Sequence, residues 1–262
     1  MSHPRLQKAP GIVHRIIDLL QDEPVTLKKC CLVSKSFVAL TRKHLFGHIK
    51  FENPVELEAW KKVFPDPLTS PAHYATSLFV NCTEVVTARD AKKGGWITPF
   101  TNVTRLEVWN GILDGPELKG SLAPFQILPS VKSLRLCFNN FPPSEVFNFI
   151  CSFPLLEDLE IVNDRDINCI GRLKVTAPPL RLPPLTGTLA LQQPLLGQVK
   201  DLLLQLPGGL HFRKIEWNVH LPKELEGMMA LVKKCSNTLE CIDIARPLFG
   251  KPSPFGPVRF SI

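Results

Sequence analysis

The sequence predicts an α/β protein in which three short N-terminal helices precede a series of strand–helix units that share one parallel sheet. Two observations carry this prediction. Apolar residues recur at helical spacing through the first 46 residues, and from residue 73 onward a short apolar-x-x-apolar-x-apolar segment recurs about every 27 residues. With 44% apolar and 21% charged residues in 262, the chain can bury a core.

The three helices are expected between prolines and small polar residues. Residues 10–21, PGIVHRIIDLLQ, form the first helix, where Pro10 suits the first turn because that position needs no N–H donor. Pro24 breaks this helix. We expect Thr26 to cap the second helix and Ser34 to cap the third.

Two adjacent cysteines, Cys30 and Cys31, lie in the second helix. Neighbouring residues on a helix point about 100° apart, so these thiols cannot readily bridge or jointly hold a metal. Free cysteine packs as a small hydrophobe, and we interpret both as packing residues. The chain has no CxxC and no cysteine–histidine spacing of a zinc site, so we expect no metal and no cofactor.

A further helix is expected over residues 54–64, between the three N-terminal helices and the repeated segments. Asn53 is its predicted cap, Pro54 its first residue, and Glu56 stands in the capping-box position. The Pro-rich exit PDPLTSP ends it. We expect this helix to pack between the two parts rather than to act as a flexible tether.

Seven strand-like segments define the repeat, and intervals of 28, 28, 25, 30, 26 and 27 residues separate their central positions. These central residues are Leu78, Leu106, Leu134, Leu159, Leu189, Ile215 and Ile242. One strand and a return of about 20 residues per unit predict right-handed crossovers and a parallel sheet.

The return segments differ in regularity. Helices are expected within 143–153, 194–207 and 222–235, whereas 165–188 is the least regular and is expected to be a long loop. No convincing capping helix follows the last strand. Either the tail folds back over the end of the sheet, or the repeat series has been shortened.

No nucleotide-binding, serine-hydrolase, metalloprotease or EF-hand motif is present, so we do not expect an enzyme. The candidate recognition residues instead share the middle position of their strands, where alternation predicts one exposed row. They are Glu107, Arg135, Glu160 and Glu216. Trp217, which replaces an aliphatic residue in its repeat, is a fifth candidate.

Charge and hydropathy indicate where in the cell this protein works and what kind of partner it binds. No run of 18 apolar residues and no secretory leader is found, so an intracellular protein, cytoplasmic or nuclear, with reduced thiols and no membrane partner is expected. Residues 1–50 carry nine Lys/Arg and three Asp/Glu, a net charge of +6. Without aromatic interleaving, this pattern favours an acidic protein partner over nucleic acid.

The N-terminal segment resembles an F-box of the style abundant in mushroom-forming fungi. The resemblance rests on P-x-I-V-x-x-I-I-D-L-L (10–20), T-L-K-K-C-C-L-V-S-K-S-F (26–37) and R-K-H-L-F-x-x-I-x-F (42–51), of which CCLVSKSF is the most specific part. It implies a three-helix domain that docks on a Skp-type adaptor of a cullin-RING ubiquitin ligase. The adaptor-facing positions it implies are Pro10, Ile12, Val13, Ile16, Ile17, Leu20, Leu27, Cys30, Val33, Ser34 and Phe37.

The start of this segment departs from the family pattern. F-boxes usually open with Leu-Pro and an acidic residue soon after, whereas this chain has Ala9, Pro10 and Gly11. A lost apolar anchor is worth about 2 kcal/mol, which corresponds to more than a tenfold loss of adaptor affinity.

The remaining sequence looks like a divergent leucine-rich-repeat solenoid, as often follows a fungal F-box. The resemblance implies an F-box at 8–51, a linking helix at 52–72 and an irregular leucine-rich-repeat-like strand–helix solenoid at 73–262. It further implies the substrate-recognition subunit of an SCF-type cullin-RING ubiquitin ligase, with an unknown protein substrate on the repeats. Two alternatives stay open: a repeat-based interaction scaffold with a degenerate F-box and no ubiquitin-ligase role, and a nucleic-acid-binding module.

Overall fold

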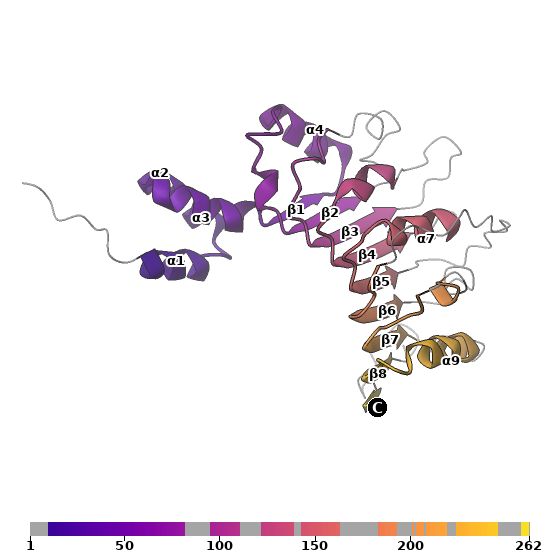
Figure 1. The fold of residues 1–262 in the computed structure, drawn as a ribbon. Coiled ribbons are helices and arrows are strands. Elements are labelled where there is room, and N and C mark those ends of the chain that lie inside the picture. Colours follow the sequence, from indigo (N-terminus) through magenta and orange to yellow (C-terminus); the bar gives the residue numbers. More distant parts are fainter. Residues whose placement is uncertain are drawn as a thin grey trace, which may run out of the picture.

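The computed structural model describes residues 10–81, 95–110, 122–138, 143–162, 183–192, 201, 203–206, 208–218, 224–245 and 258–261. Within them the chain is an α/β protein whose strands form one nine-stranded sheet in chain order (Figure 1). The first eight strands are parallel, and the ninth pairs antiparallel with the eighth.

The helices and strands have the following bounds. The α-helices are α1 (Pro10–Leu19), α2 (Pro24–Val33), α3 (Lys35–Phe46), α4 (Pro54–Val63), α7 (Pro143–Cys151) and α9 (Glu224–Cys235), with 3₁₀ helices η1 (Pro71–Tyr74) and η2 (Ala123–Ile127). The strands are β1 (His48–Phe51), β2 (Ser77–Asn81), β3 (Arg105–Asn110), β4 (Ser133–Phe138), β5 (Asp158–Val162), β6 (Thr188–Gln192), β7 (Lys214–Asn218), β8 (Cys241–Ala245) and β9 (Val258–Ser261).

Helices α1 to α3 form a head that projects from the β1 end of the sheet (Figure 1). The predicted cap at Ser34 is confirmed, because its Oγ accepts a hydrogen bond from the Ser36 N–H at 3.3 Å. The predicted cap at Thr26 is wrong. Helix α2 already begins at Pro24 with Glu23 in the cap position, since a proline that ends one helix also suits the first turn of the next.

The seven central repeat residues lie in register across β2 to β8, from Leu78 opposite Leu106 to Ile215 opposite Ile242. A further strand, not expected from the sequence, precedes them, with Ile49 of β1 opposite Leu78. The expected boundary after residue 51 falls directly after β1. Helix α4 lies within the expected linking segment and connects β1 to β2.

Helices α4, α7 and α9 lie along the same side of the sheet (Figure 1). Because successive side chains of a strand point to opposite faces, each strand sends its central leucine or isoleucine toward this side. Leu78, Leu106 and Leu134 are completely buried there. The opposite face, here called the open face, carries no helix within the described residues.

Backbone hydrogen bonds tie each unit to the next at the start of the strands. The Gly47 carbonyl accepts from the Thr76 and Ser77 N–H groups at 2.9 and 3.0 Å, and the carbonyls of Thr76, Thr104 and Lys132 repeat this pattern. Between β5 and β6 a side chain takes part instead, where Asp158 Oδ1 accepts from the Thr188 N–H at 2.6 Å.

The expected helices within 143–153 and 222–235 are confirmed as α7 and α9. The expected helix at 194–207 and the expected loop at 165–188 lie largely outside the described residues. The cap of the linking helix is also confirmed, because Asn53 Oδ1 accepts from the Glu56 N–H at 3.1 Å. After β8 the chain folds back as β9.

Candidate functional site

Helix α1 is apolar on two sides. Ile17 is 1% exposed and packs inside the head, whereas Ile12, Ile16 and Leu19 face solvent, with Leu19 79% exposed. The outward residues are spaced i, i+4 and i+7, which places them on one stripe of a helix. A stripe that the head's own packing leaves uncovered is a candidate contact surface.

Helix α2 has the same arrangement. Leu27 is buried, while Val25, Leu32 and Val33 are exposed. Six of the thirteen exposed large hydrophobic side chains among the described residues therefore lie on two ten-residue helices. We call these six residues the head apolar surface: Ile12, Ile16, Leu19, Val25, Leu32 and Val33.

The structure separates the predicted adaptor-facing residues into three groups: interior, exposed and half-buried. Ile17 and Leu27 are interior residues at 1% exposure, so their assignment as contact residues is corrected: they face the other helices of the head. Ile12, Ile16, Val33 and the capping Ser34 are exposed. Half-buried positions are Val13, Leu20, Cys30 and Phe37, and the side chain of Pro10 is not among those that the structure describes.

Three residues of the head apolar surface, Leu19, Val25 and Leu32, were missed by sequence reasoning. The signal was available in the spacing, since Leu19 follows Ile12 by seven residues and Leu32 follows Val25 by seven. A helix with apolar residues on opposite sides indicates one face for its own core and one for a partner.

Polar contacts hold the three head helices together. Cys31 Sγ lies 2.7 Å from Thr41 Oγ1 across the α2–α3 contact, and Thr41 is completely buried. Asp18 Oδ1 lies 2.8 Å from His44 Nε2 and joins α1 to α3. These contacts place Cys31 in a packing role within the head.

A second candidate surface is the middle row of the open face, which contains one residue from each of β1 to β8. The predicted row is confirmed in its register, because Glu107, Arg135 and Glu160 lie opposite one another and Glu216 follows after Ala190. Its four side chains are half-buried rather than fully exposed. The complete row is Lys50, Phe79, Glu107, Arg135, Glu160, Ala190, Glu216 and Asp243.

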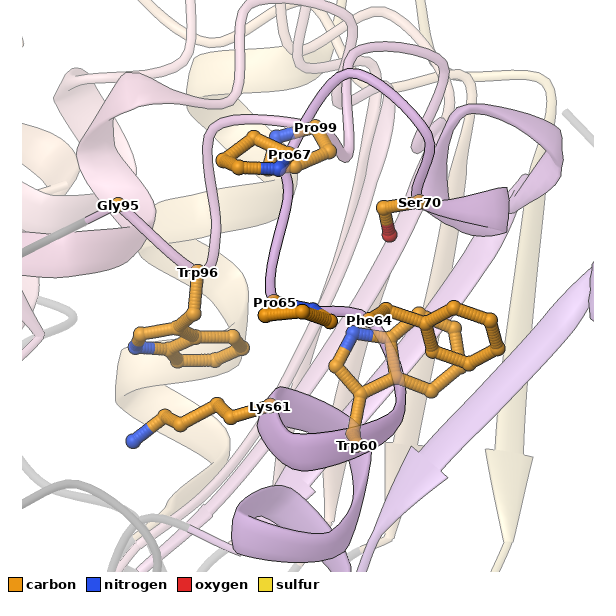
Figure 2. A pocket seen from close by; sticks show the side chains of 9 residues that line it. All are labelled: Trp60, Lys61, Phe64, Pro65, Pro67, Ser70, Gly95, Trp96 and Pro99. Atoms are coloured by element: carbon orange, nitrogen blue, oxygen red, sulfur yellow. The ribbon is translucent and has the colours of Figure 1, made fainter.

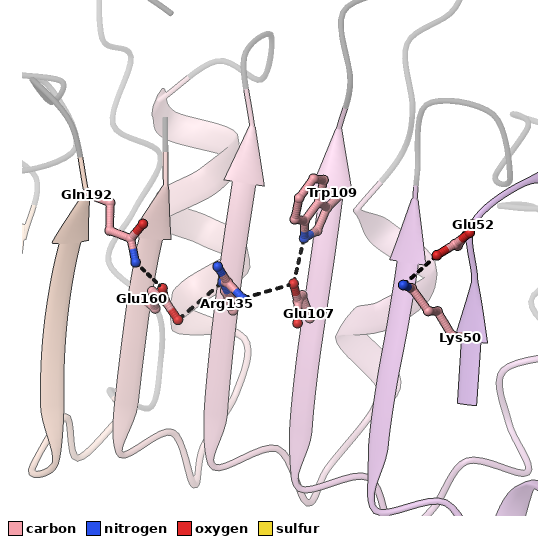
Figure 3. Close-up of polar contacts among 7 residues, drawn as sticks. All are labelled: Lys50, Glu52, Glu107, Trp109, Arg135, Glu160 and Gln192. Atoms are coloured by element: carbon pink, nitrogen blue, oxygen red, sulfur yellow. Dashed lines mark hydrogen bonds and ion pairs between the residues drawn. The ribbon is translucent and has the colours of Figure 1, made fainter. Parts of the chain in front are cut away.

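Arg135 lies between two carboxylates of this row (Figure 3). Its Nη1 lies 3.3 Å from Glu107 Oε1, and its buried Nε lies 3.3 Å from Glu160 Oε2 without hydrogen-bond geometry. Gln192 Nε2 donates to the other oxygen of Glu160 at 2.6 Å. Burial raises the pKa of Glu160; Arg135 opposes this shift and Glu107 adds to it.

Glu216 belongs to a separate ion-pair cluster. Lys214 Nζ lies 2.7 Å from Asp243 Oδ2 and 2.5 Å from Glu216 Oε1. The hydrogen bonds to Asp243 and Glu216 raise the pKa of Lys214. The four predicted row residues therefore share one line, but Glu216 makes its contacts with a different set of side chains.

Trp217 does not join this surface. It lies opposite Leu191 and Ile244, one residue along β7 from Glu216, so strand alternation turns it to the other face. Its exposure is 5% and it is part of the hydrophobic core. The interpretation of Trp217 as a surface contact is corrected: the aliphatic position that it replaces is a core position.

An aromatic pair on the open face was not predicted. The rings of Phe79 and Trp109 lie 5.7 Å apart, and Lys50 Nζ lies 4.8 Å from the centre of the Phe79 ring. Trp109 Nε1 donates to Glu107 Oε1 at 2.6 Å (Figure 3). These residues line a hollow of about 690 Å³ over β1, β2 and β3, which we call the aromatic hollow and which Glu52 also lines.

A smaller hollow of about 320 Å³ lies beside α4 (Figure 2). Trp60, Phe64 and Trp96 line it together with three prolines. The Trp60 ring lies 4.6 Å from Phe64 and 5.8 Å from Phe51 of β1. These ring contacts attach α4 to the sheet, so we interpret this hollow as the outer side of a packing cluster.

Within the described residues, no group of three or more His, Cys, Asp or Glu side chains could hold a metal ion. None of the helices described there combines the length and the apolar character needed to cross a membrane. No model of a known protein family matches this sequence, and no curated protein matches it.

Proposed function

We propose that this chain is the substrate-recognition subunit of an SCF-type cullin-RING ubiquitin ligase. The head binds a Skp-type adaptor and, through it, a cullin, while the open face of the sheet binds a protein substrate. The observation that carries the proposal is the head apolar surface. It lies on the two helices whose sequence resembles an F-box.

The energetics favour a partner on these helices. Burial of a Leu, Ile or Val side chain contributes about 1.5–3 kcal/mol, and six such side chains are exposed on α1 and α2. Single exposed hydrophobic residues are normal on protein surfaces, whereas an apolar stripe along one side of a helix, as found on α1 and again on α2, is typical of an interaction site. The head projects from the β1 end of the sheet (Figure 1), so its partner leaves the open face accessible.

For the body we propose a divergent leucine-rich-repeat-like solenoid. Two observations support this. Each repeating unit contributes one strand and the strands pair in chain order, and a buried leucine occupies the same position in each of β2 to β6. Such an arrangement presents one row of side chains per strand position, which suits recognition of an extended surface.

Co-purification with a Skp-type adaptor from a mushroom-forming fungus tests the proposal. We expect the wild type to form a stable complex and Leu32→Asp and Ile16→Asp to lose it. Leu68→Asp is the matched control, because Leu68 is 91% exposed but lies outside the head. We expect Leu68→Asp to bind as the wild type does, with all four proteins melting at similar temperatures.

The opposite result has a definite meaning. If folded wild type forms no complex, the proposed role is wrong, and a repeat scaffold with a degenerate F-box becomes the better interpretation of the chain. If Leu68→Asp also abolishes the complex, the head apolar surface is not the adaptor site.

A further inference from the structure

We propose that the aromatic hollow binds an arginine side chain presented by an extended segment of a partner protein. The inference deepens the proposed function, on which it rests for the identity of that partner as a substrate. The choice of arginine rests on the shape, rings and charges of the hollow alone.

The exposed ring of Trp109 is the first element of the site. Trp109 is 42% exposed, while the core tryptophan Trp217 is buried. Phe79 packs against Trp109 at 5.7 Å, and Lys50 already lies over the Phe79 ring. The Phe79 ring therefore already contacts the ammonium group of Lys50, while the exposed indole face of Trp109 is available to a second cation. Tryptophan is the best aromatic partner for a cation.

The carboxylate of Glu107 is the second element. It is two residues from Trp109 on β3, so both side chains lie on the open face. The hydrogen bond from Trp109 Nε1 and the contact with Arg135 both use Oε1. A carboxylate has about four lone-pair sites, so Glu107 can accept further hydrogen bonds from a ligand that lies on the indole.

The charged side chains of the hollow favour a positively charged ligand. The hollow is lined by one cation, Lys50, and two carboxylates, Glu52 and Glu107. Lys50 is ion-paired with Glu52, and Arg135, which does not line the hollow, contacts Glu107 through Oε1. Glu107, with its second oxygen Oε2, is therefore the carboxylate left to pair with a cationic ligand that lies on the indole of Trp109. A planar guanidinium can lie flat on an indole and direct N–H groups at a carboxylate at the same time, which an ammonium group cannot do equally well.

Fluorescence anisotropy with a labelled Gly-Ser-Arg-Gly-Ser-Arg peptide tests this inference on the full chain. The control peptide carries citrulline, a neutral group of the same shape, in place of arginine. We expect the wild type to bind the arginine peptide and not the citrulline peptide. We expect Glu107→Gln and Trp109→Leu each to weaken binding by about fivefold or more.

The matched control is Glu240→Gln, which removes the same charge from an exposed carboxylate at the far end of the sheet. Binding within twofold of wild type is expected. Equal binding of both peptides, equal weakening by Glu240→Gln, or no binding at millimolar peptide would each overturn the inference. Circular dichroism spectra and melting curves establish that each variant is folded.

The two proposals fail separately in this design. Leu32→Asp is expected to lose the adaptor and to keep full affinity for the arginine peptide, since it lies in the head. A wild type that binds the peptide but no adaptor overturns only the proposed function. A wild type that binds the adaptor but not the peptide overturns only the arginine site.

Discussion

Arg135 Nε lies 3.3 Å from Glu160 Oε2, and yet the pKa of Glu160 is raised above its ordinary value. Burial is the largest cause, because it removes water from the charged form. The nearby Glu107 carboxylate adds repulsion, and together these effects outweigh the attraction of Arg135. The attraction of Arg135 therefore offsets only part of the cost that burial puts on the ionised form of Glu160.

Replacement of Glu160 by glutamine tests this balance, because the two proteins should differ in how their stability depends on pH. Since the pKa of Glu160 is higher in the folded state than the unfolded value of about 4.3, the folded state binds this proton more tightly. The stability contributed by Glu160 therefore falls as pH rises through that window and levels off above the folded pKa. Urea unfolding of wild type and Glu160→Gln at several pH values measures the difference. If the wild type instead becomes more stable relative to Glu160→Gln as the pH increases, the pKa of Glu160 is not raised in the folded state.

Two buried thiols are expected to be unreactive. Burial raises the pKa of Cys137 and of Cys151 to about 12. The thiolate is the reactive form, so at about pH 8 both residues are almost fully protonated. We expect iodoacetamide to modify them slowly in the native protein and rapidly in urea, as measured by peptide mass spectrometry. Rapid native modification of Cys137 would show that the thiol is accessible and ionised.

Two adjacent isoleucines in α1 provide a matched pair for stability. Ile17 is buried and Ile16 is half exposed. We expect Ile17→Ala to lower the free energy of unfolding by about 2–5 kcal/mol and Ile16→Ala to change it by about 0.5 kcal/mol or less. Urea unfolding followed by circular dichroism measures both. Similar losses in the two variants would mean that the head buries the outward stripe as well.

The turn before β6 depends on a glycine. A Cβ atom at Gly187 would lie 2.2 Å from Asp158 Oδ1, which accepts the hydrogen bond of the Thr188 N–H. We expect Gly187→Ala to destabilise the protein by about 1–3 kcal/mol. Gly11→Ala is the control, because a Cβ there meets no atom within 4 Å. It is expected to stabilise α1 by about 0.5–1 kcal/mol, and thermal unfolding compares the two.

Periodicity predicted the sheet well, because a strand alternates its side chains and the repeat spacing fixes their register. Spacing alone was enough to place Glu107, Arg135 and Glu160 on one line, and the strand pairing confirms that line. The same alternation, applied strictly, would also have placed Trp217 in the core. Strand β1 was missed because its four residues, His48–Phe51, lie within the segment that resembles an F-box, which implies helices only.

The candidate sites were harder to predict than the fold. Spacing shows which residues share a face, but it does not show which faces remain uncovered. Ile12 and Ile17 are both apolar residues of α1, and only packing separates them. Phe79 and Trp109 were absent from the predicted site because aromatic residues in strands are usually core residues. Their contacts with Lys50 and Glu107 come from three strands that only the folded sheet brings together.

The chain order of the strands has a consequence for how this protein is made. Each of β2 to β9 pairs with the strand synthesised just before it, so no strand has to wait for a distant partner. A ribosome releases the chain from its N-terminus, and β1 and β2 can pair while later units are still being translated. The sheet can therefore lengthen one unit at a time during synthesis, with the head already outside the ribosome and able to fold first.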